Sequence, residues 1–192
     1  RNEKDWPRYI YHDAKYDKRP GEKFLYTNAN TYMLGCLVEK KAGVNLFEYM
    51  RYRLFEPLGI KNPNMTACPL GHTVAANGMD INVDEMSRFG QMLLDKGVFN
   101  NKRIVSEEFV NKALAPLVKT DTKSYWPSED ENLSYGYQFW VDAANNCSFL
   151  LGILGQMTLV LPGKNAVVSI QSLEQRSDLI AKLLWKHVVE IL

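Results

Sequence analysis

A tyrosine and an asparagine stand two residues apart in the segment EKFLYTNANTYMLG, which covers residues 22–35. Both Tyr26 and Asn28 carry hydrogen-bonding groups, and an apolar pattern of helical spacing follows them. A phenol can act as a base where nearby cations favour its ionised form. The pair is therefore open to two interpretations. It is a turn followed by a helix cap at Asn28, or it is half of an active site.

The cysteines and histidines do not suggest a metal site. Cys36, Cys68 and Cys147 are widely spaced and odd in number, which argues against a disulfide framework and against zinc-type spacing. Cys36 falls on an apolar helix face, where a cysteine is expected to be a core residue. The three histidines are scattered and form no H-E-x-x-H pattern. We therefore expect no metal site and no cofactor.

The composition is that of a folded domain, with 46% hydrophobic and 23% charged residues among 192. The net charge is +1, and no clustered basic face predicts a nucleic-acid partner. The apolar runs are far shorter than the roughly 18–20 residues of a membrane helix, so no membrane span is expected. The sequence starts at Arg1 rather than Met, which indicates a processed or excerpted product and favours neither a periplasmic or secreted nor a cytoplasmic location.

The helices that would position the pair follow from start and stop signals. A helix is predicted from Asn28 or Asn30 to about Ala42, with Gly43 as its stop. Further helices are predicted after residues that can cap an N-terminus, at Asn45, Asn82 and Ser106. Residues 1–22 are charged and aromatic without a period, and predict a surface segment that leads into the site. Residues 117–133 are polar and irregular, and predict a mobile loop.

The last part of the sequence predicts strands and one amphipathic helix. Four short β-prone runs cover Tyr135–Val141, Phe149–Ile153, Met157–Leu161 and Ala166–Gln171. Pro162–Asn165 is a hairpin connection between the last two. The sequence therefore predicts one partial domain of the α+β class. Residues 1–133 form its mainly helical part, and residues 134–192 form an antiparallel sheet of three or four strands with a C-terminal helix packed on it.

Five blocks in order resemble the β-lactamase-like serine hydrolases, which include class C β-lactamases, D-alanyl-D-alanine peptidases, esterases and 6-aminohexanoate-dimer hydrolases. The blocks are PGEKFLYTNANTYMLGCLVEKKAG, NLFEYMRYRLFEPLGI, MSRFGQMLLDKGVFNNKRIVSEEFV, YGYQFWV and GILGQMTLVLP. The resemblance implies a β-lactamase/transpeptidase-like fold and an acyl-enzyme mechanism. Family members use a serine in S-x-x-K, a Y-x-N motif, and a third motif that lends a backbone N–H to the oxyanion hole.

Carried over by position, the resemblance assigns roles to three residues of this sequence. Tyr26 would be the catalytic residue that moves protons between the serine and the leaving group. Asn28 would hydrogen-bond the bound substrate. Gly152 lies in the third motif and would bind substrate through the backbone, which needs no particular side chain. The implied partner is a small-molecule ester or amide.

The sequence departs from the family pattern at the nucleophile. No S-x-x-K occurs in the 192 residues, and the T-x-x-K at Thr120–Lys123 lies in the wrong order and context. We therefore expect part of a longer hydrolase that is inactive by itself. Its exposed sheet edge and apolar face predict contact with a missing N-terminal segment or self-association.

The third motif also differs from that of the relatives. Residues Cys147–Leu151 are nearly all apolar where relatives carry Lys, His, Arg or Asp. This favours an esterase or amidase over an enzyme selective for a penicillin-like carboxylate. The alternative function is a catalytically silent relative whose cleft binds a ligand or a protein partner.

Overall fold

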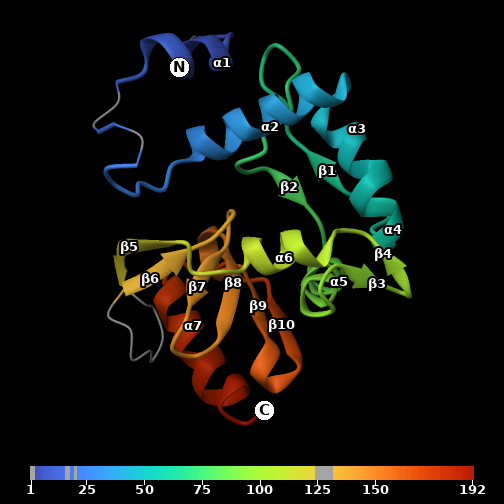
Figure 1. The fold of residues 1–192 in the computed structure, drawn as a ribbon, viewed down its shortest axis with the longest axis vertical. Helices are drawn as coiled ribbons and strands as arrows, with labels where there is room; N and C mark the ends of the chain where they lie inside the picture. The colour runs from blue at the N-terminus through green and yellow to red at the C-terminus, as the bar shows by residue number, and fades with distance from the viewer. Residues whose placement is uncertain (1–2, 16–17, 20, 124–131) are drawn as a thin grey trace. The chain divides into compact units, whose positions relative to one another are not determined.

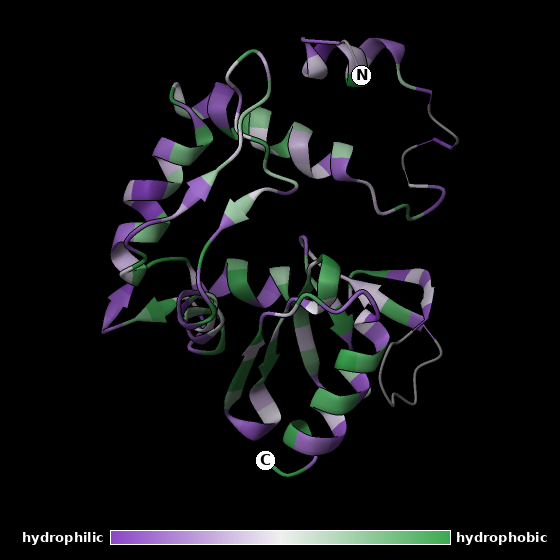
Figure 2. Ribbon diagram, turned by 180° about the vertical axis from the view of Figure 1, so that it is seen from behind, coloured by the Kyte–Doolittle hydropathy of each residue, from purple (hydrophilic) through white to green (hydrophobic). Residues whose placement is uncertain are grey.

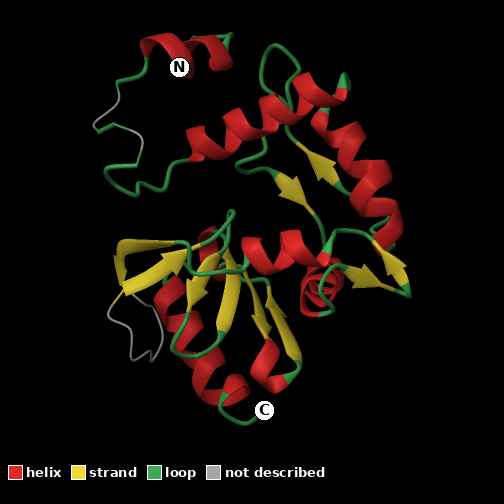
Figure 3. Cartoon of the chain, viewed as in Figure 1, coloured by secondary structure: helices red, strands yellow, loops and turns green. Residues whose placement is uncertain are grey.

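The computed structural model describes residues 3–15, 18–19, 21–123 and 132–192. The chain forms two compact units, residues 1–81 and residues 82–192 (Figure 1). Helices and antiparallel strands are both present, and a helix follows the last strand, which confirms the predicted α+β class (Figure 3). Within the described ranges, no helix combines the length and the apolar character that crossing a bilayer requires.

The first unit is mainly helical. Its elements are α1 (Trp6–Arg8) with a π-helical turn (Tyr9–Asp13), α2 (Asn28–Ala42), α3 (Leu46–Met50) with a π-helical turn (Arg51–Phe55), α4 (Glu56–Leu58), β1 (Asn64–Met65) and β2 (Met79–Asp80). Helix α2 begins and ends where the sequence predicts, because Gly43 adopts φ 71°, a left-handed conformation that glycine accepts readily.

Residues 1–22, predicted as a surface segment without apolar periodicity, contain a short helical stretch at residues 6–13. The Asp5 carboxylate accepts a hydrogen bond from the backbone N–H of Arg8 at 3.0 Å. Pro7 occupies the first turn of α1, where its missing N–H costs nothing. An N-cap followed by proline was therefore a local helix signal inside a segment that lacks apolar periodicity.

Glu39 joins three segments of the first unit. Its Oε1 accepts the backbone N–H of Leu46, at the start of α3, and that of Thr73, each at 3.0 Å. Its Oε2 lies 2.6 Å from Nδ1 of His72. Burial raises the pKa of the Glu39 carboxyl, but the two N–H donors and His72 outweigh burial, and the net pKa lies below the ordinary value. The Glu39 carboxylate therefore stays charged, and its hydrogen bonds hold the three segments together.

The second unit contains a six-stranded antiparallel sheet in the order β10-β9-β8-β7-β6-β5. Its strands are β5 (Val118–Lys123), β6 (Asn132–Tyr135), β7 (Trp140–Asp142), β8 (Cys147–Leu151), β9 (Met157–Leu161) and β10 (Ala166–Ile170). The other elements are α5 (Val83–Leu94), β3 (Val98–Phe99), β4 (Lys102–Arg103), α6 (Glu107–Ala113) and α7 (Ser177–Leu184) with a π-helical turn (Trp185–Val189). The predicted N-cap at Asn82 is confirmed and forms a capping box: Asn82 Oδ1 accepts the Glu85 N–H at 2.9 Å, and Glu85 Oε2 accepts the Asn82 N–H at 3.1 Å.

The prediction of three or four strands is wrong, because the sheet has six. Two of its strands were not recognised in the sequence. The predicted loop 117–133 contains β5 and the start of β6, while its residues 124–131 lie outside the described residues. Polar side chains masked β5. The predicted strand Tyr135–Val141 is instead interrupted by a turn, in which Gly136 N–H donates to Phe139 O at 2.9 Å and Gln138 adopts φ 68°.

Helix α5 packs against β9 and β10. All five residues of β9 are buried, as expected for a strand covered on both faces. Figure 2 shows hydrophobic residues concentrated on the strands of this sheet and on α7. Gly90 lets α5 approach, since a Cβ atom there would lie 2.6 Å from Val167 Cγ1 and 2.9 Å from Thr158 Cγ2.

We expect Gly90→Ala to lower the free energy of unfolding by about 1–2 kcal/mol, because overpacking costs more than the helix propensity that alanine adds. Gly163→Ala is the matched control, since its Cβ would meet only Asn146 Nδ2, at an ordinary 3.5 Å. Urea unfolding measures both variants. Equal midpoints for Gly90→Ala and Gly163→Ala would contradict this packing.

Candidate active site

Thr27, not Asn28, caps helix α2. Thr27 is extended, with φ −142° and ψ 143°, and its Oγ1 accepts the backbone N–H of Asn30 at 3.2 Å. Asn28 is the first residue of the helix and its side chain is exposed. The interpretation of Asn28 as an N-cap is therefore wrong. Its amide remains available for another role, and Tyr26, two residues earlier, is 47% exposed.

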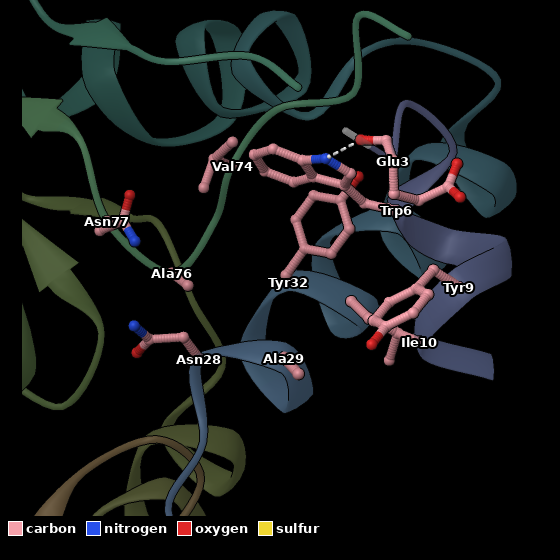
Figure 4. A pocket seen from close by; sticks show the side chains of 10 residues that line it. All are labelled: Glu3, Trp6, Tyr9, Ile10, Asn28, Ala29, Tyr32, Val74, Ala76 and Asn77. Atoms are coloured by element: carbon pink, nitrogen blue, oxygen red, sulfur yellow. Dashed lines mark hydrogen bonds between the residues drawn. The ribbon is translucent and has the colours of Figure 1, made fainter. Parts of the chain in front are cut away.

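A pocket of about 430 Å³ opens beside Asn28 in the first unit (Figure 4). This volume lies within the range of small-ligand sites. Its walls come from the first helix, from the start of α2 and from the segment before β2. The lining residues are Glu3, Trp6, Tyr9, Ile10, Asn28, Ala29, Tyr32, Val74, Ala76 and Asn77. Asn28 and Asn77 lie on the same side of the pocket (Figure 4).

The aromatic wall is held in place by two contacts. The indole Nε1–H of Trp6 donates to the Glu3 backbone carbonyl at 2.9 Å. The Trp6 ring meets Tyr32 of α2 edge-on, with ring centroids 5.7 Å apart and planes at 63°, a favourable arrangement for aromatic pairs. Trp6 and Tyr9 were not predicted as site residues from the sequence. The Asp5–Pro7 helix start was the signal that could have placed them.

Gly152 lies in the second unit, directly after β8. Its N–H donates to the backbone carbonyl of Gln156 at 2.8 Å, which closes the turn Ile153–Gly155. A Cβ atom at Gly152 would lie 3.0 Å from Gln156 Oε1, so the glycine permits a close approach of that side chain. In this conformation the Gly152 N–H is engaged within the turn. The Y-x-N pair and the third motif thus belong to different units.

The T-x-x-K sequence at Thr120 is part of the sheet. Thr120 is buried on β5, where its hydroxyl donates to Leu133 O at 2.7 Å and accepts the Thr122 N–H at 3.0 Å. Both bonds tie the hydroxyl to the sheet. This supports the interpretation of the T-x-x-K match as a coincidence.

Comparisons with known proteins agree on one family. Residues 3–187 match the profile of the Beta-lactamase family. The 6-aminohexanoate-dimer hydrolase of Paenarthrobacter ureafaciens is 29% identical over 150 residues, which cover 76% of this chain and 38% of the relative.

Solved structures of other proteins share the fold. A Bacillus anthracis protein assigned as a 6-aminohexanoate-dimer hydrolase matches 95% of this chain and 47% of its own, with a TM-score of 0.79 at 23% identity. A penicillin-binding protein from Bacillus halodurans matches with a TM-score of 0.70 at 18% identity, over 93% of this chain and 59% of its own. The chain thus spans less than two thirds of each of these relatives. By its fold and by its family profile, the chain belongs to the Beta-lactamase family.

Proposed function

We propose that the chain carries the Y-x-N part of a β-lactamase-related serine hydrolase that acts on a small ester or amide. The observation that carries the proposal is the Asn28 amide, which the Thr27 cap leaves available at the edge of a ligand-sized pocket. The nucleophilic serine would belong to an S-x-x-K segment outside residues 1–192, consistent with the greater length of the relatives.

In this mechanism the Tyr26 phenolate accepts the serine proton as the serine oxygen attacks the substrate carbonyl. The phenol then returns that proton to the departing alcohol or amine, which leaves an acyl-enzyme. Water hydrolyses the acyl-enzyme in a second half-reaction with the same proton transfers. Asn28 would hold the substrate by hydrogen bonds from its amide.

The pocket favours an apolar substrate group without an anion. Its walls are largely aromatic and aliphatic, and among the described residues that line it Glu3 carries the formal charge. A carboxylate at this position repels an anionic substrate and attracts an amine. Together with the apolar residues of β8, this supports an esterase or amidase rather than an enzyme selective for penicillin-like carboxylates.

A catalytically silent ligand-binding module is the second candidate. The observation that favours it is the Gly152 N–H, which donates within its own turn. A substrate carbonyl could use this donor only if the turn opened. A silent relative would still bind an apolar ligand in the pocket beside Asn28.

Covalent labelling distinguishes the two candidates. For the full-length protein we expect a stoichiometric adduct with a fluorophosphonate probe, together with hydrolysis of short-chain p-nitrophenyl esters in preference to penicillin-type substrates. Residues 1–192 alone are expected to show neither. Absence of both labelling and hydrolysis in the full-length protein would favour the binding module. Robust turnover by residues 1–192 alone would contradict the position assigned to the serine.

Trp6 is expected to determine affinity for apolar substrates. Trp6→Ala removes the ring that packs on Tyr32, and we expect KM for a hexanoyl or phenyl ester to rise about 5–30-fold, as for a loss of roughly 1–2 kcal/mol of apolar contact. Trp6→Phe keeps an aromatic wall and should retain most of the affinity. Initial rates against ester chain length measure the effect, and an equal KM for both variants would contradict it.

We also propose that a further segment or a second copy covers exposed apolar side chains of α2 or an open edge of the sheet. Leu34, Leu37 and Val38 are exposed on this helix, and the strands β5 and β10 form the two edges of the sheet. Exposed apolar side chains and open strand edges are common features of contact surfaces. Analytical ultracentrifugation of residues 1–192 tests the proposal, because a monomer at all concentrations would exclude self-association.

A further inference from the structure

We propose that Cys36, Glu39 and His72 bind a divalent transition metal ion of the zinc class. One ligand atom from each residue, a thiol sulfur, a carboxylate oxygen and an imidazole nitrogen, lies within 4.8 Å of the other two. All three residues belong to the first unit. The proposed hydrolysis uses none of them, so this site goes beyond that function.

The backbone brings the three side chains together. Cys36 and Glu39 are three residues apart on α2 and therefore share one face of the helix. His72 comes from the loop between β1 and β2. This loop is held by hydrogen bonds from Cys68 N–H to His72 O and from Gly71 N–H to Cys68 O, each at 2.9 Å. The loop thus holds His72 opposite the helix.

The carboxylate is already oriented for coordination. Glu39 is 9% exposed, and its Oε1 is held by the backbone N–H groups of Leu46 and Thr73. These bonds act as the outer-shell contacts that typically orient a metal-binding carboxylate. Its Oε2 points to His72 Nδ1, at 2.6 Å. Oε2 is therefore the atom that the geometry presents to an ion.

Metal binding requires a small rearrangement at His72. Ligand atoms around tetrahedral zinc are about 3.3–3.7 Å apart, given bond lengths of about 2.0–2.3 Å. Nδ1 of His72 and Oε2 of Glu39 would therefore separate by roughly 1 Å. The His72 side chain is 40% exposed and can move, whereas Glu39 is fixed. The same exposure leaves room for water as a fourth ligand.

The ligand types favour zinc over calcium or magnesium. Thiolate and imidazole are ligands for zinc, cobalt and related ions, whereas calcium and magnesium prefer sites made of oxygen atoms. One thiolate, one imidazole and one carboxylate would leave a bound Zn²⁺ site close to neutral. Such a site is compatible with partial burial.

The Tyr32 hydroxyl supplies a second, independent observation. Tyr32 is 3% exposed, and its hydroxyl lies beside the thiols of Cys36 and Cys68. Within the described part of the chain this buried hydroxyl has no strong hydrogen-bond acceptor, and the groups beside it are the two weakly accepting thiols. A buried donor with only weak acceptors costs stability. If Cys36 bound the metal as a thiolate, its sulfur would accept a hydrogen bond from the Tyr32 hydroxyl. Tyr32 would then be an outer-shell donor to a metal ligand.

A bound metal ion would link two walls of the pocket beside Asn28. Tyr32 on α2 lines the pocket, and so do Val74 and Ala76, which follow His72 in the chain. An ion bound by Cys36, Glu39 and His72 would link these two walls. The expected role is therefore structural, and it is independent of the nucleophile.

Cobalt titration of the purified metal-free protein tests the site. We expect one Co²⁺ per chain, with a thiolate-to-cobalt charge-transfer band in the near ultraviolet that Zn²⁺ displaces. Cys36→Ser should abolish the band, and His72→Gln should weaken Zn²⁺ binding by at least about 100-fold. His187→Gln is the matched control, since His187 is exposed in the second unit, and should bind as the unmodified protein does.

A measurement on the unmodified protein covers the case in which a variant fails to fold. Bound Zn²⁺ should slow alkylation of Cys36 by iodoacetamide at least about tenfold, as read by peptide mass spectrometry. Cys147 is 1% exposed, so it should stay unmodified with or without Zn²⁺. Absence of the cobalt band, its persistence in Cys36→Ser, or unchanged alkylation of Cys36 would each overturn the proposal. None of these readouts depends on hydrolysis, so failure of the metal site and failure of the proposed function are distinguishable.

Discussion

Tyr26→Phe should reduce kcat and kcat/KM for ester hydrolysis by the full-length protein about 10²–10⁴-fold, the usual contribution of a general acid or base. Phenylalanine keeps the ring but can neither accept nor return a proton. Because the proton transfer occurs in the transition state, kcat and kcat/KM should fall together while KM changes little. Steady-state kinetics with p-nitrophenyl butyrate measure the effect.

Tyr11→Phe is the matched control for this prediction. Tyr11 is exposed in the same unit and, like Tyr26, loses only a phenolic oxygen in the variant. It should retain the full rate. Thermal unfolding of Tyr26→Phe should match that of the unmodified protein, since Tyr26 is half exposed. A Tyr26→Phe enzyme with an unchanged rate would refute the assigned role, whereas a fall in rate accompanied by unfolding would indicate a structural role.

Glu39→Ala should destabilise the first unit by about 2–5 kcal/mol in metal-free buffer. The variant removes the acceptor for two buried backbone N–H groups, those of Leu46 and Thr73, and each unsatisfied buried donor costs about 1–3 kcal/mol. It also removes the partner of His72. Urea unfolding in the presence of a chelator, followed by far-ultraviolet circular dichroism, measures the loss.

Two further variants separate the effect of the Glu39 hydrogen bonds from a general effect of removing a charge. Glu39→Gln keeps the Oε1 acceptor and should lose clearly less stability than Glu39→Ala. Glu48→Ala removes a half-exposed carboxylate that pairs with Arg51 at 2.7 Å, and its effect should stay within about 1 kcal/mol. Comparable losses of unfolding free energy for Glu39→Ala and Glu48→Ala would contradict a stabilising role for the Glu39 hydrogen bonds.

The elements predicted correctly from the sequence depend on neighbours within a few residues. The capping box of Asn82 with Glu85, the left-handed stop at Gly43 and the hairpin connection Pro162–Asn165 are all local contacts of side chain or backbone. Such contacts form in the same way whatever the rest of the chain does. For the same reason the contiguous Y-x-N motif was recognisable without a structure.

The elements that were missed depend on distant partners. Strand β5 looked like a loop because Thr120 is polar. Its hydroxyl donates to Leu133 O, across the strand pair β5–β6. Helix α6 likewise contributes to the break after Tyr135, because Ala113 O accepts the Tyr137 N–H at 2.9 Å. Neither partner is visible from the local pattern.

The sequence by itself determined the family and the α+β class, and it predicts the pair Tyr26 and Asn28, because these rest on contiguous motifs and on short-range capping. Only the tertiary structure decided that Thr27 rather than Asn28 caps α2, and that Trp6 and Val74 line one pocket with Asn28. It also decided that His72 meets Glu39, from 33 residues further along the chain. The physical reason is that pockets and ligand clusters form where distant segments pack together, and packing depends on long-range contacts that no local spacing encodes.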